Sequence, residues 1–269
     1  MELVTTHTHT GYTGHGEGTV EELVAAAEAA GISTIAVTEH YPLSTAFDTD
    51  AYLSMDARRV GDYLADIEAA RAAHPGIEVI AGCELDWLGD DEDRTFGPHD
   101  FDPFAVVLGS VHFVDRWAFD DPNVRDRWET VGVDAIWRRY FEVWCEAVSC
   151  AAAPFTVMAH PDLVKKFGYR PSFDPQPLYD QAAEACAAAG RMVEVNTSGA
   201  GYACKELFPA PALLAAFRRA GVPCTVGTDA HTAAKVAQGI PQAYDLMRQA
   251  GYRVVTVPTA DGDRREIAL

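Results

Sequence analysis

Short apolar segments rich in β-branched residues alternate with longer alanine-rich segments along the whole chain. The short segments are predicted strands, at residues 3–6, 34–38, 78–82, 105–110, 155–159, 192–196, 223–228 and 253–257. After a first helix near residue 20, further helices are predicted at residues 51–73, 134–151, 177–189, 211–220 and 233–250. Strands that alternate with helices are typical of a parallel sheet with helical crossovers, so the pattern predicts the α/β class.

The first helix has the clearest boundaries. Thr19 and Glu22 have the spacing of a capping box directly before residues 23–30, and Gly31 follows as a stop signal. No low-complexity linker, internal repeat or shift in composition divides the chain. We therefore expect residues 1–269 to form a single domain.

Histidines gather at the predicted carboxyl ends of the strands or in the loops that follow them. Seven of the nine histidines do so, namely His7, His9, His15, His40, His112, His160 and His231. Three acids, Glu84, Glu194 and Asp229, also end strands. In a closed βα barrel these ends converge on one face, so residues far apart in sequence would meet in one cup.

A structural role is the alternative for any single histidine. His74 and His99 stand beside prolines in predicted turns and fit that role. The acidic stretch 86–102 likewise has the composition of a solvated surface loop. Seven histidines placed at strand ends do not fit a structural role, and imidazole is the commonest nitrogen ligand of metals. The pattern therefore predicts a polynuclear metal site.

The spacing of the candidate ligands supports chelation. His7 and His9 are two residues apart on an extended segment, so both side chains point to the same side. Asp229 and His231 repeat this spacing, and Glu84 offers two oxygens that could bridge two ions. Nitrogen and oxygen donors without thiolate suit Zn, Mn or Fe.

Counting the donors suggests how many ions the site holds. The seven histidines with Glu84 and Asp229, Glu84 counted twice as a bridge, offer ten donor atoms. Three four-coordinate ions need about twelve, which leaves positions for water or for substrate oxygens. A cup that holds several divalent ions can bind an anion even in an acidic protein.

Composition limits the partners. The formal net charge of −19 disfavours nucleic acid and anionic membrane surfaces. The longest apolar run, residues 150–159, is shorter than the ~20 residues of a membrane span. The six cysteines form no Cys-x-x-Cys pair, and the first residues do not resemble a signal peptide. We therefore expect a cytoplasmic protein with reduced thiols that acts on a small molecule; the sequence leaves its oligomeric state open.

Four motif regions resemble the PHP superfamily, named for polymerase and histidinol phosphatase. They are His7-Thr8-His9, Thr38-Glu39-His40, Gly109-Ser110-Val111-His112 with Ala159-His160-Pro161, and Gly227-Thr228-Asp229-Ala230-His231, which span nearly the whole chain. Narrower motifs, at residues 14–19, 39–42, 160–163, 194–199 and 205–209, are similar to the histidinol-phosphate phosphatase branch. One departure is Thr5, where the family often has Asp two residues before the first histidine.

The resemblance implies a distorted (β/α)7 TIM-like barrel with three divalent ions at its C-terminal face. By motif, the first ion would be held by His7, His9, Glu84 and Asp229, the second by Glu84, His112 and His160, and the third by His15, His40 and His231. Asp229, Glu84 and His231 are the candidate catalytic residues. Candidate substrate contacts are Glu39 for a cationic end, Lys205, Lys165 and Lys166 for phosphate, and Glu194, for which a metal contact stays open.

The activity implied by the resemblance is hydrolysis of L-histidinol phosphate to L-histidinol and phosphate. One alternative is a PHP phosphoesterase of broader or nucleotide specificity with the same ligands. A second alternative is a non-catalytic metal-binding barrel, which the shortfall of donors disfavours because a structural site is normally closed.

Overall fold

The computed structural model describes residues 1–89 and 99–269, and within them seven parallel strands form one sheet. In sheet order the strands are β1 (Leu3–Thr5), β2 (Ile32–His40), β3 (Glu78–Asp86), β4 (Val106–Ser110), β7 (Val157–Met158), β8 (Met192–Asn196) and β9 (Cys224–Gly227). Each neighbour in the sheet is also the next of these strands along the chain. The prediction of an α/β fold with parallel strands is confirmed.

The two outer strands of this sheet, β1 and β9, meet and close it into a barrel. The amide of Thr6 donates to the carbonyl of Val226 at 2.9 Å, and Thr8 forms a parallel bridge with Ala230. The amide of Asp229 donates to the carbonyl of His7 at 2.8 Å. The contact that closes the barrel therefore also brings the first and last candidate ligands together.

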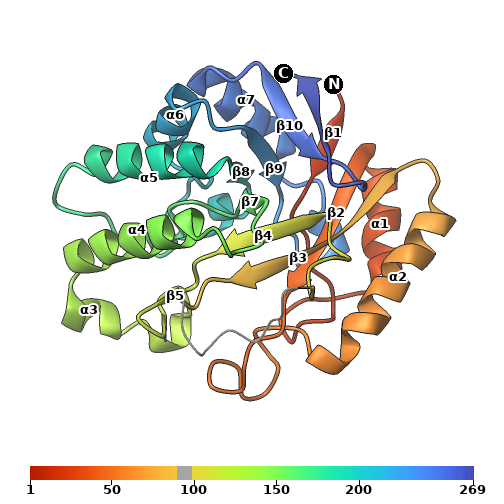
Figure 1. Cartoon of the computed structure of the whole chain (residues 1–269), viewed down its shortest axis with the longest axis horizontal. Coiled ribbons are helices and arrows are strands. Elements are labelled where there is room, and N and C mark those ends of the chain that lie inside the picture. Colours follow the sequence, from red (N-terminus) through yellow and green to blue (C-terminus); the bar gives the residue numbers. More distant parts are fainter. Residues whose placement is uncertain (90–98) are drawn as a thin grey trace.

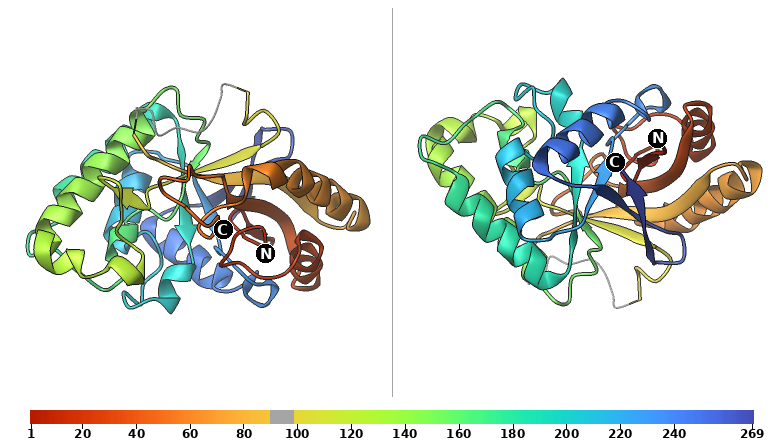
Figure 2. Two further views of the ribbon diagram at one scale, coloured as in Figure 1. Left: turned by 90° about the horizontal axis from the view of Figure 1, so that it is seen from below. Right: turned by 90° about the horizontal axis from the view of Figure 1, so that it is seen from above.

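Helices surround the barrel. They are α1 (Val20–Ala29), α2 (Val60–Ala73), α4 (Val133–Ser149), α5 (Gln176–Ala189), α6 (Pro211–Arg219) and α7 (Ile240–Ala250). Helices α1 and α2 lie together on one side, with α4 and α5 on the opposite side (Figures 1 and 2). No helix in the described parts of the chain has both the length and the apolar character that a membrane span requires.

The predicted start of the first helix is confirmed. The amide of Glu22 donates to Thr19 Oγ1 at 3.1 Å, and the amide of Thr19 donates to Glu22 Oε2 at 2.9 Å. These reciprocal bonds satisfy amides that the first helical turn leaves without partners.

Two predicted helices begin later than the sequence suggested. Residues 51–56 are not helical, because the carboxylate of Asp48 accepts hydrogen bonds from the amides of Tyr52, Leu53 and Ser54 and bends this segment instead. Helix α7 starts only at Ile240, because Gly239 adopts a φ of 78°. These local contacts outweigh the helical propensity of the preceding residues.

The last predicted strand lies outside the barrel. It is β10 (Val254–Pro258), and it pairs antiparallel with β11 (Arg264–Ala268), a strand that the sequence pattern did not predict. In β11, Arg265 contacts Glu2 at 2.5 Å, so this hairpin lies beside the start of the chain (Figure 1). The barrel therefore has seven strands, and the hairpin is an addition to it.

A small insertion follows β4 at the C-terminal face of the barrel. It comprises the hairpin of β5 (Phe113–Val114) and β6 (Trp117–Ala118) and the short helix α3 (Arg127–Val131). Its aromatic residues pack together, with the rings of Trp117 and Trp128 5.8 Å apart and Trp128 stacked on Tyr169 at 4.7 Å. The packed insertion thus borders one side of the barrel mouth.

The acidic residues 90–93 fall outside the described residues.

Candidate metal centre

Alternation along the strands places the candidate ligands above the apolar interior of the barrel. Ala36 and Ile80 belong to a small buried cluster, and His40 and Glu84 lie four residues further along the same strands. Because strand side chains alternate with period two, each pair points to the same side. Gly82 lies between Ile80 and Glu84, where a Cβ atom would come within 2.8 Å of the backbone oxygen of Val106.

Four donor atoms converge on one point. His7 Nε2 lies 2.9 Å from His9 Nε2, 3.2 Å from Glu84 Oε2 and 3.6 Å from Asp229 Oδ1. His9 Nε2 lies 3.3 Å from both of these oxygens. Donors about 2.0–2.1 Å from a tetrahedral zinc ion are separated by about 3.3 Å, so these separations suit a shared ion. His7, His9 and Glu84 form one group of donors that all lie within 4.8 Å of one another, and Asp229 lies close to both histidines. Glu84 Oε2 has no hydrogen-bond partner, although it is buried.

Glu84 also reaches a second group of nitrogens. Its Oε1 lies 2.8 Å from His160 Nε2 and 3.7 Å from His112 Nε2, and it accepts a hydrogen bond from Ser110 Oγ. Its other oxygen, Oε2, lies 3.0 Å from His40 Nδ1. The two oxygens of one carboxylate therefore face different imidazoles, as a bridge between ions requires.

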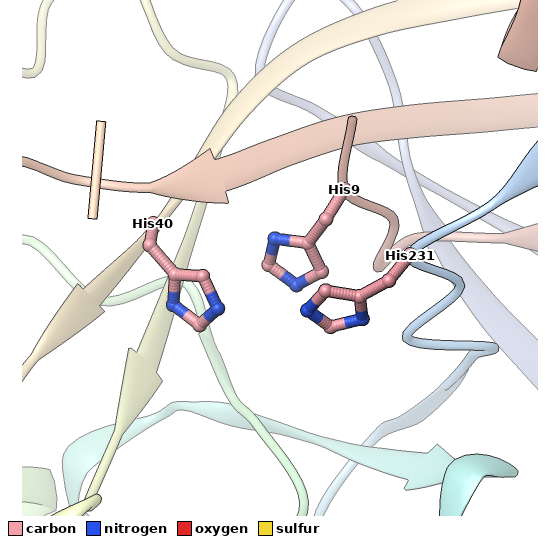
Figure 3. Close-up of side chains that lie close together, drawn as sticks. All are labelled: His9, His40 and His231. Carbon is pink, nitrogen blue, oxygen red and sulfur yellow. The ribbon is translucent and has the colours of Figure 1, made fainter. Parts of the chain in front are cut away.

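A third cluster of imidazoles lies beside these donors. The ring of His9 stacks on the rings of His40 and His231, with centroids 4.3 Å apart in both pairs (Figure 3). His40, His231 and His9 have nitrogens within 4.8 Å of one another, whereas the resemblance grouped His15 with the first two. The ring of His15 lies 4.9 Å from that of His231, so it borders this cluster.

The second ring nitrogen of several histidines is held by an oxygen. His7 Nδ1 lies 3.0 Å from Glu194 Oε1, and His112 Nδ1 lies 2.8 Å from Asp86 Oδ1. Backbone carbonyls do the same for two further histidines: Tyr52 O for His15 at 2.9 Å and Asp229 O for His231 at 3.0 Å. An Nδ1–H that donates to oxygen leaves Nε2 free to bind a metal.

The backbone before Asp229 is fixed by a contact between two threonines. The amide of Thr228 donates to Thr5 Oγ1 at 3.0 Å, and the two threonine hydroxyls lie 3.1 Å apart. Asp229 itself adopts a φ of 53°. At the position where the family often has Asp, a hydroxyl group therefore holds the residue before a candidate ligand.

The acids of the cluster are held in their ionised form. Burial opposes ionisation of Glu84, but the imidazoles of His40 and His7 outweigh it and hold the pKa of this carboxyl well below its ordinary value. The pKa of Asp229 is likewise lowered, because the imidazoles of His7, His9 and His231 together outweigh the effect of burial. Burial alone would lower the pKa of His112, but Asp86 raises it to about 10.

An open cavity of about 340 Å³ lies over this cluster. Its lining includes Glu84, Asp229 and His231 of the candidate catalytic residues, together with the insertion after β4. Lys166 also lines it, with its ammonium 2.8 Å from the carboxylate of Asp120, which lines the cavity as well.

The structure does not place Lys165 or Lys205, two of the lysines predicted to contact phosphate, in the lining of the cavity. The side chain of Lys165 is 0% exposed, and its ammonium lies 3.0 Å from Asp162 Oδ2 and donates to the carbonyl of Leu207. Lys205 is exposed, with a φ of 53°. Neither is among the residues that line the cavity.

Glu39 and Glu194 are also placed behind the metal centre and not in the cavity. Glu194 is fully buried: it contacts His7, and its Oε2 accepts from the amide of His160 at 2.9 Å. Glu39 is fully buried beside Thr10, and burial raises the pKa of its carboxyl to about 8. Glu39 therefore does not line the cavity, and Glu194 contacts a histidine.

Asp86 and Asp120 were missed as part of the site by the sequence analysis. Asp86 belongs to the acidic stretch that was interpreted as a solvated surface loop, but the structure places it at the end of β3, two residues after Glu84. Because strand side chains alternate with period two, Asp86 and Glu84 point to the same side of the strand, and this spacing is the signal in the sequence that could have identified Asp86. Asp120 lies in the insertion, where no strand or helix pattern places its side chain.

The remaining histidines lie away from the cluster. His74 contacts Glu28 at 2.7 Å and Glu21 at 2.8 Å, and His99 is largely exposed beside Asp102. The histidines and acids that gather at the barrel mouth thus form several groups able to hold metal ions. A cation bound between these buried carboxylates and imidazoles satisfies both kinds of donor atom, so a metal suits these residues.

Comparison with known proteins agrees with this geometry. The family model described as "PHP domain" matches residues 5–198. A protein of Deinococcus radiodurans named "Probable histidinol-phosphatase" is 32% identical over 259 residues, which are 94% of this chain and 96% of that protein. The crystal structure of histidinol phosphate phosphatase from Lactococcus lactis, complexed with zinc, L-histidinol and phosphate, has a TM-score of 0.78 at 21% identity and covers 98% of this chain and 99% of that one.

Proposed function

This chain belongs to the PHP domain family, and from that premise we propose that it is a metal-dependent histidinol-phosphatase. It hydrolyses L-histidinol phosphate to L-histidinol and phosphate. The observation that carries the proposal is the set of four donor atoms from His7, His9, Glu84 and Asp229, arranged for one ion on the floor of an open cavity. The relative named as a histidinol-phosphatase supports the choice of substrate.

Three divalent ions are the number that the ligand groups support best. The first group comprises His7, His9 and Glu84 with Asp229 close to the two histidines, the second comprises Glu84, His112 and His160, and the third comprises His40 and His231 with His15 beside them. Bound ions supply an activated water as the nucleophile and neutralise charge on the phosphoryl oxygens. Zn, Mn and Fe are the metals that such nitrogen and oxygen donors accept.

The residues of the chain orient the substrate and move the proton. Asp229 and His231 face the cavity with side chains 13% and 25% exposed. The ionised carboxylate of Asp229 can accept the proton of the attacking water and pass it to the leaving alkoxide, with His231 beside it. Asn196 Nδ2 and Ser198 Oγ donate to Asp229 Oδ2 at 3.4 and 3.1 Å, which fixes the orientation of this carboxylate.

The cavity wall offers both charges that the substrate needs. L-Histidinol phosphate carries an anionic phosphate at one end and an ammonium group at the other. Lys166 is the cavity residue with a fixed positive charge among those described, and Asp120 faces it from the insertion. We assign Lys166 to the negative charge of the phosphate that the metal ions do not neutralise, and Asp120 to the ammonium group of the substrate. When the substrate binds, the ion pair between Lys166 and Asp120 is replaced by two others, one between Lys166 and the phosphate and one between Asp120 and the ammonium group.

Steady-state kinetics with three substrates test this specificity. We expect kcat/KM for L-histidinol phosphate to exceed that for a nucleoside monophosphate and for an aryl phosphate, by up to ~10⁴-fold. The variant Asp120→Asn should narrow this preference, because it weakens binding of the cationic substrate while the aryl phosphate is handled as before. Asp126→Asn is the matched control, because Asp126 is an exposed acid of the same insertion that does not line the cavity.

The outcomes separate the alternatives. Equal efficiencies would favour a phosphoesterase of broad specificity, and a preference for the nucleotide would overturn the proposal. Absence of turnover with every phosphate ester by the metal-loaded protein would favour a non-catalytic metal-binding barrel.

A further inference from the structure

Glu39 is a fully buried acid that the proposed reaction does not use. Its Oε1 accepts hydrogen bonds from the amide and from the hydroxyl of Thr10. Its Oε2 has no hydrogen-bond partner and faces His9 Nδ1 at 3.9 Å. His9 Nδ1 has no hydrogen-bond partner either. Two unpartnered polar atoms thus face each other directly behind the metal centre.

We propose that Glu39 is a positioning residue that accepts the Nδ1 proton of His9 and so keeps His9 Nε2 free to bind metal. The inference rests on the proposed metal centre. It assigns Glu39 a role on the side of His9 remote from the substrate.

The chemistry of imidazole supports this role. A neutral imidazole carries one N–H, so a histidine that binds an ion through Nε2 must carry its proton on Nδ1. His9 Nε2 is the nitrogen that points at His7, Glu84 and Asp229, which leaves Nδ1 as the protonated atom. A buried N–H needs an acceptor, and Glu39 Oε2 is the unpartnered oxygen in front of it.

Two neighbouring ligands already have such a partner. His7 Nδ1 contacts the carboxylate of Glu194 at 3.0 Å, and His112 Nδ1 contacts the carboxylate of Asp86 at 2.8 Å. Glu39 offers His9 the same kind of partner from β2, since the positive charge of bound ions would offset the burial that raises the pKa of its carboxyl. Carboxylates behind metal-binding histidines fix the ring and its tautomer, and their loss typically costs about 10–100-fold in metal affinity.

The substitution Glu39→Gln distinguishes this role from simple packing. Glutamine has almost the same shape, and its carbonyl oxygen can keep both bonds from Thr10. Its NH₂ group must then face His9 Nδ1, where a donor meets a donor. His9 is thereby driven to carry its proton on Nε2, the atom that must bind the ion.

The test is a zinc titration of the metal-free protein against a competing chelator. The variant His9→Ala identifies the binding step that depends on His9. In Glu39→Gln we expect that step to weaken by about 10–100-fold, with thermal unfolding of the metal-free protein unchanged. Glu22→Gln is the matched control, because Glu22 also accepts a backbone amide but lies at the start of α1. Zinc affinity equal to wild type in Glu39→Gln would overturn the inference.

A second measurement needs no variant at Glu39. In zinc-loaded wild type, ¹H–¹⁵N spectra of the imidazole groups should show a His9 proton on Nδ1 that exchanges slowly with water. A proton on Nε2, or rapid exchange at Nδ1, would contradict the inference even if Glu39→Gln failed to fold. A wild-type protein that bound no zinc would instead contradict the proposed metal centre.

Discussion

Glu84 is a candidate ligand whose two carboxylate oxygens contact different groups of histidines. Its Oε2 lies within 3.3 Å of nitrogens of His7, His9 and His40, whereas its Oε1 contacts His160 at 2.8 Å. A change at this carboxylate therefore affects more than one ion at once.

Glu84→Gln should reduce kcat/KM by at least about 100-fold, which corresponds to about 2.7 kcal/mol of barrier. The cause is loss of the negative charge that the two ligand groups share. Steady-state assays with elemental analysis measure both effects. Glu78→Gln, on the same strand but at the opposite end of the barrel, should keep activity. Turnover near that of wild type with full metal occupancy in Glu84→Gln would refute the bridging role.

Individual ligands could be predicted from the sequence better than substrate contacts. His7 and His9 follow from strand period alone, because both side chains must point into the barrel. Lys165 and Lys166 are adjacent, yet Lys165 is buried against Asp162 and Lys166 lines the cavity. A one-residue difference in a short 3₁₀ turn decides this, and no sequence period describes such a turn.

At the scale of elements, strand β9 leaves space for a carboxylate from β8. A Cβ atom at Gly227 would lie 1.8 Å from Glu194 Oε1 and 2.5 Å from the Cβ of His7. Glycine at this position therefore lets Glu194 reach both His7 and the amide of His160. The glycine acts by the absence of a side chain and not by its backbone freedom.

Gly227→Ala should displace Glu194, lower zinc occupancy and cost about 1–3 kcal/mol of stability through overpacking. Elemental analysis and thermal unfolding check the two effects. Gly61→Ala is the matched control, because nothing lies within 4 Å of a Cβ there. In helix α2 this control should be neutral or stabilising by up to about 1 kcal/mol. A Gly227→Ala protein with wild-type metal content would contradict the packing described here.

Helices α1 and α2 are joined by His74, which contacts Glu28 and Glu21 of α1. These two hydrogen bonds raise the pKa of His74 above its ordinary value of about 6.5. The protonated form is thus favoured in the folded state. Its contribution to stability is complete below the unfolded pKa and is lost as pH rises through the raised one.

His74→Ala should therefore be less stable than wild type at pH 5.5, and the difference should shrink as pH rises above about 6.5. Chemical unfolding at a series of pH values measures this, while zinc content and activity should not change. His99→Ala, at a largely exposed histidine, should show no such trend. A stability difference that grows with pH would contradict the assignment.

Elements with a strong local signal could be predicted, and those set by distant contacts could not. Thr19 and Glu22 fix the start of α1 through neighbours in sequence. The start of α2 depends on Asp48, which binds amides four to six residues ahead and replaces a predicted turn of helix. Strand β10 has the same local pattern as the barrel strands, but only its pairing with β11 shows that it lies outside.

The fold of the whole molecule brings together residues that lie far apart in the sequence. Because the barrel closes between β1 and β9, His7 and Asp229 lie at one mouth although 222 residues separate them along the chain. The net charge of −19 does not by itself suit an anionic substrate. Metal ions held at that mouth reverse the local charge, so the acidic surface and a phosphate substrate are compatible.

The most direct test is phosphate release from L-histidinol phosphate by protein stripped of metal with a chelator and then reloaded with zinc or manganese. The structure predicts that stripping abolishes turnover and that reloading restores it as two to three ions bind per chain. His7→Ala and Asp229→Ala should retain fewer ions and fail to recover. Stripped protein that releases phosphate at the untreated rate, or loaded protein that leaves L-histidinol phosphate intact, would contradict the assignment.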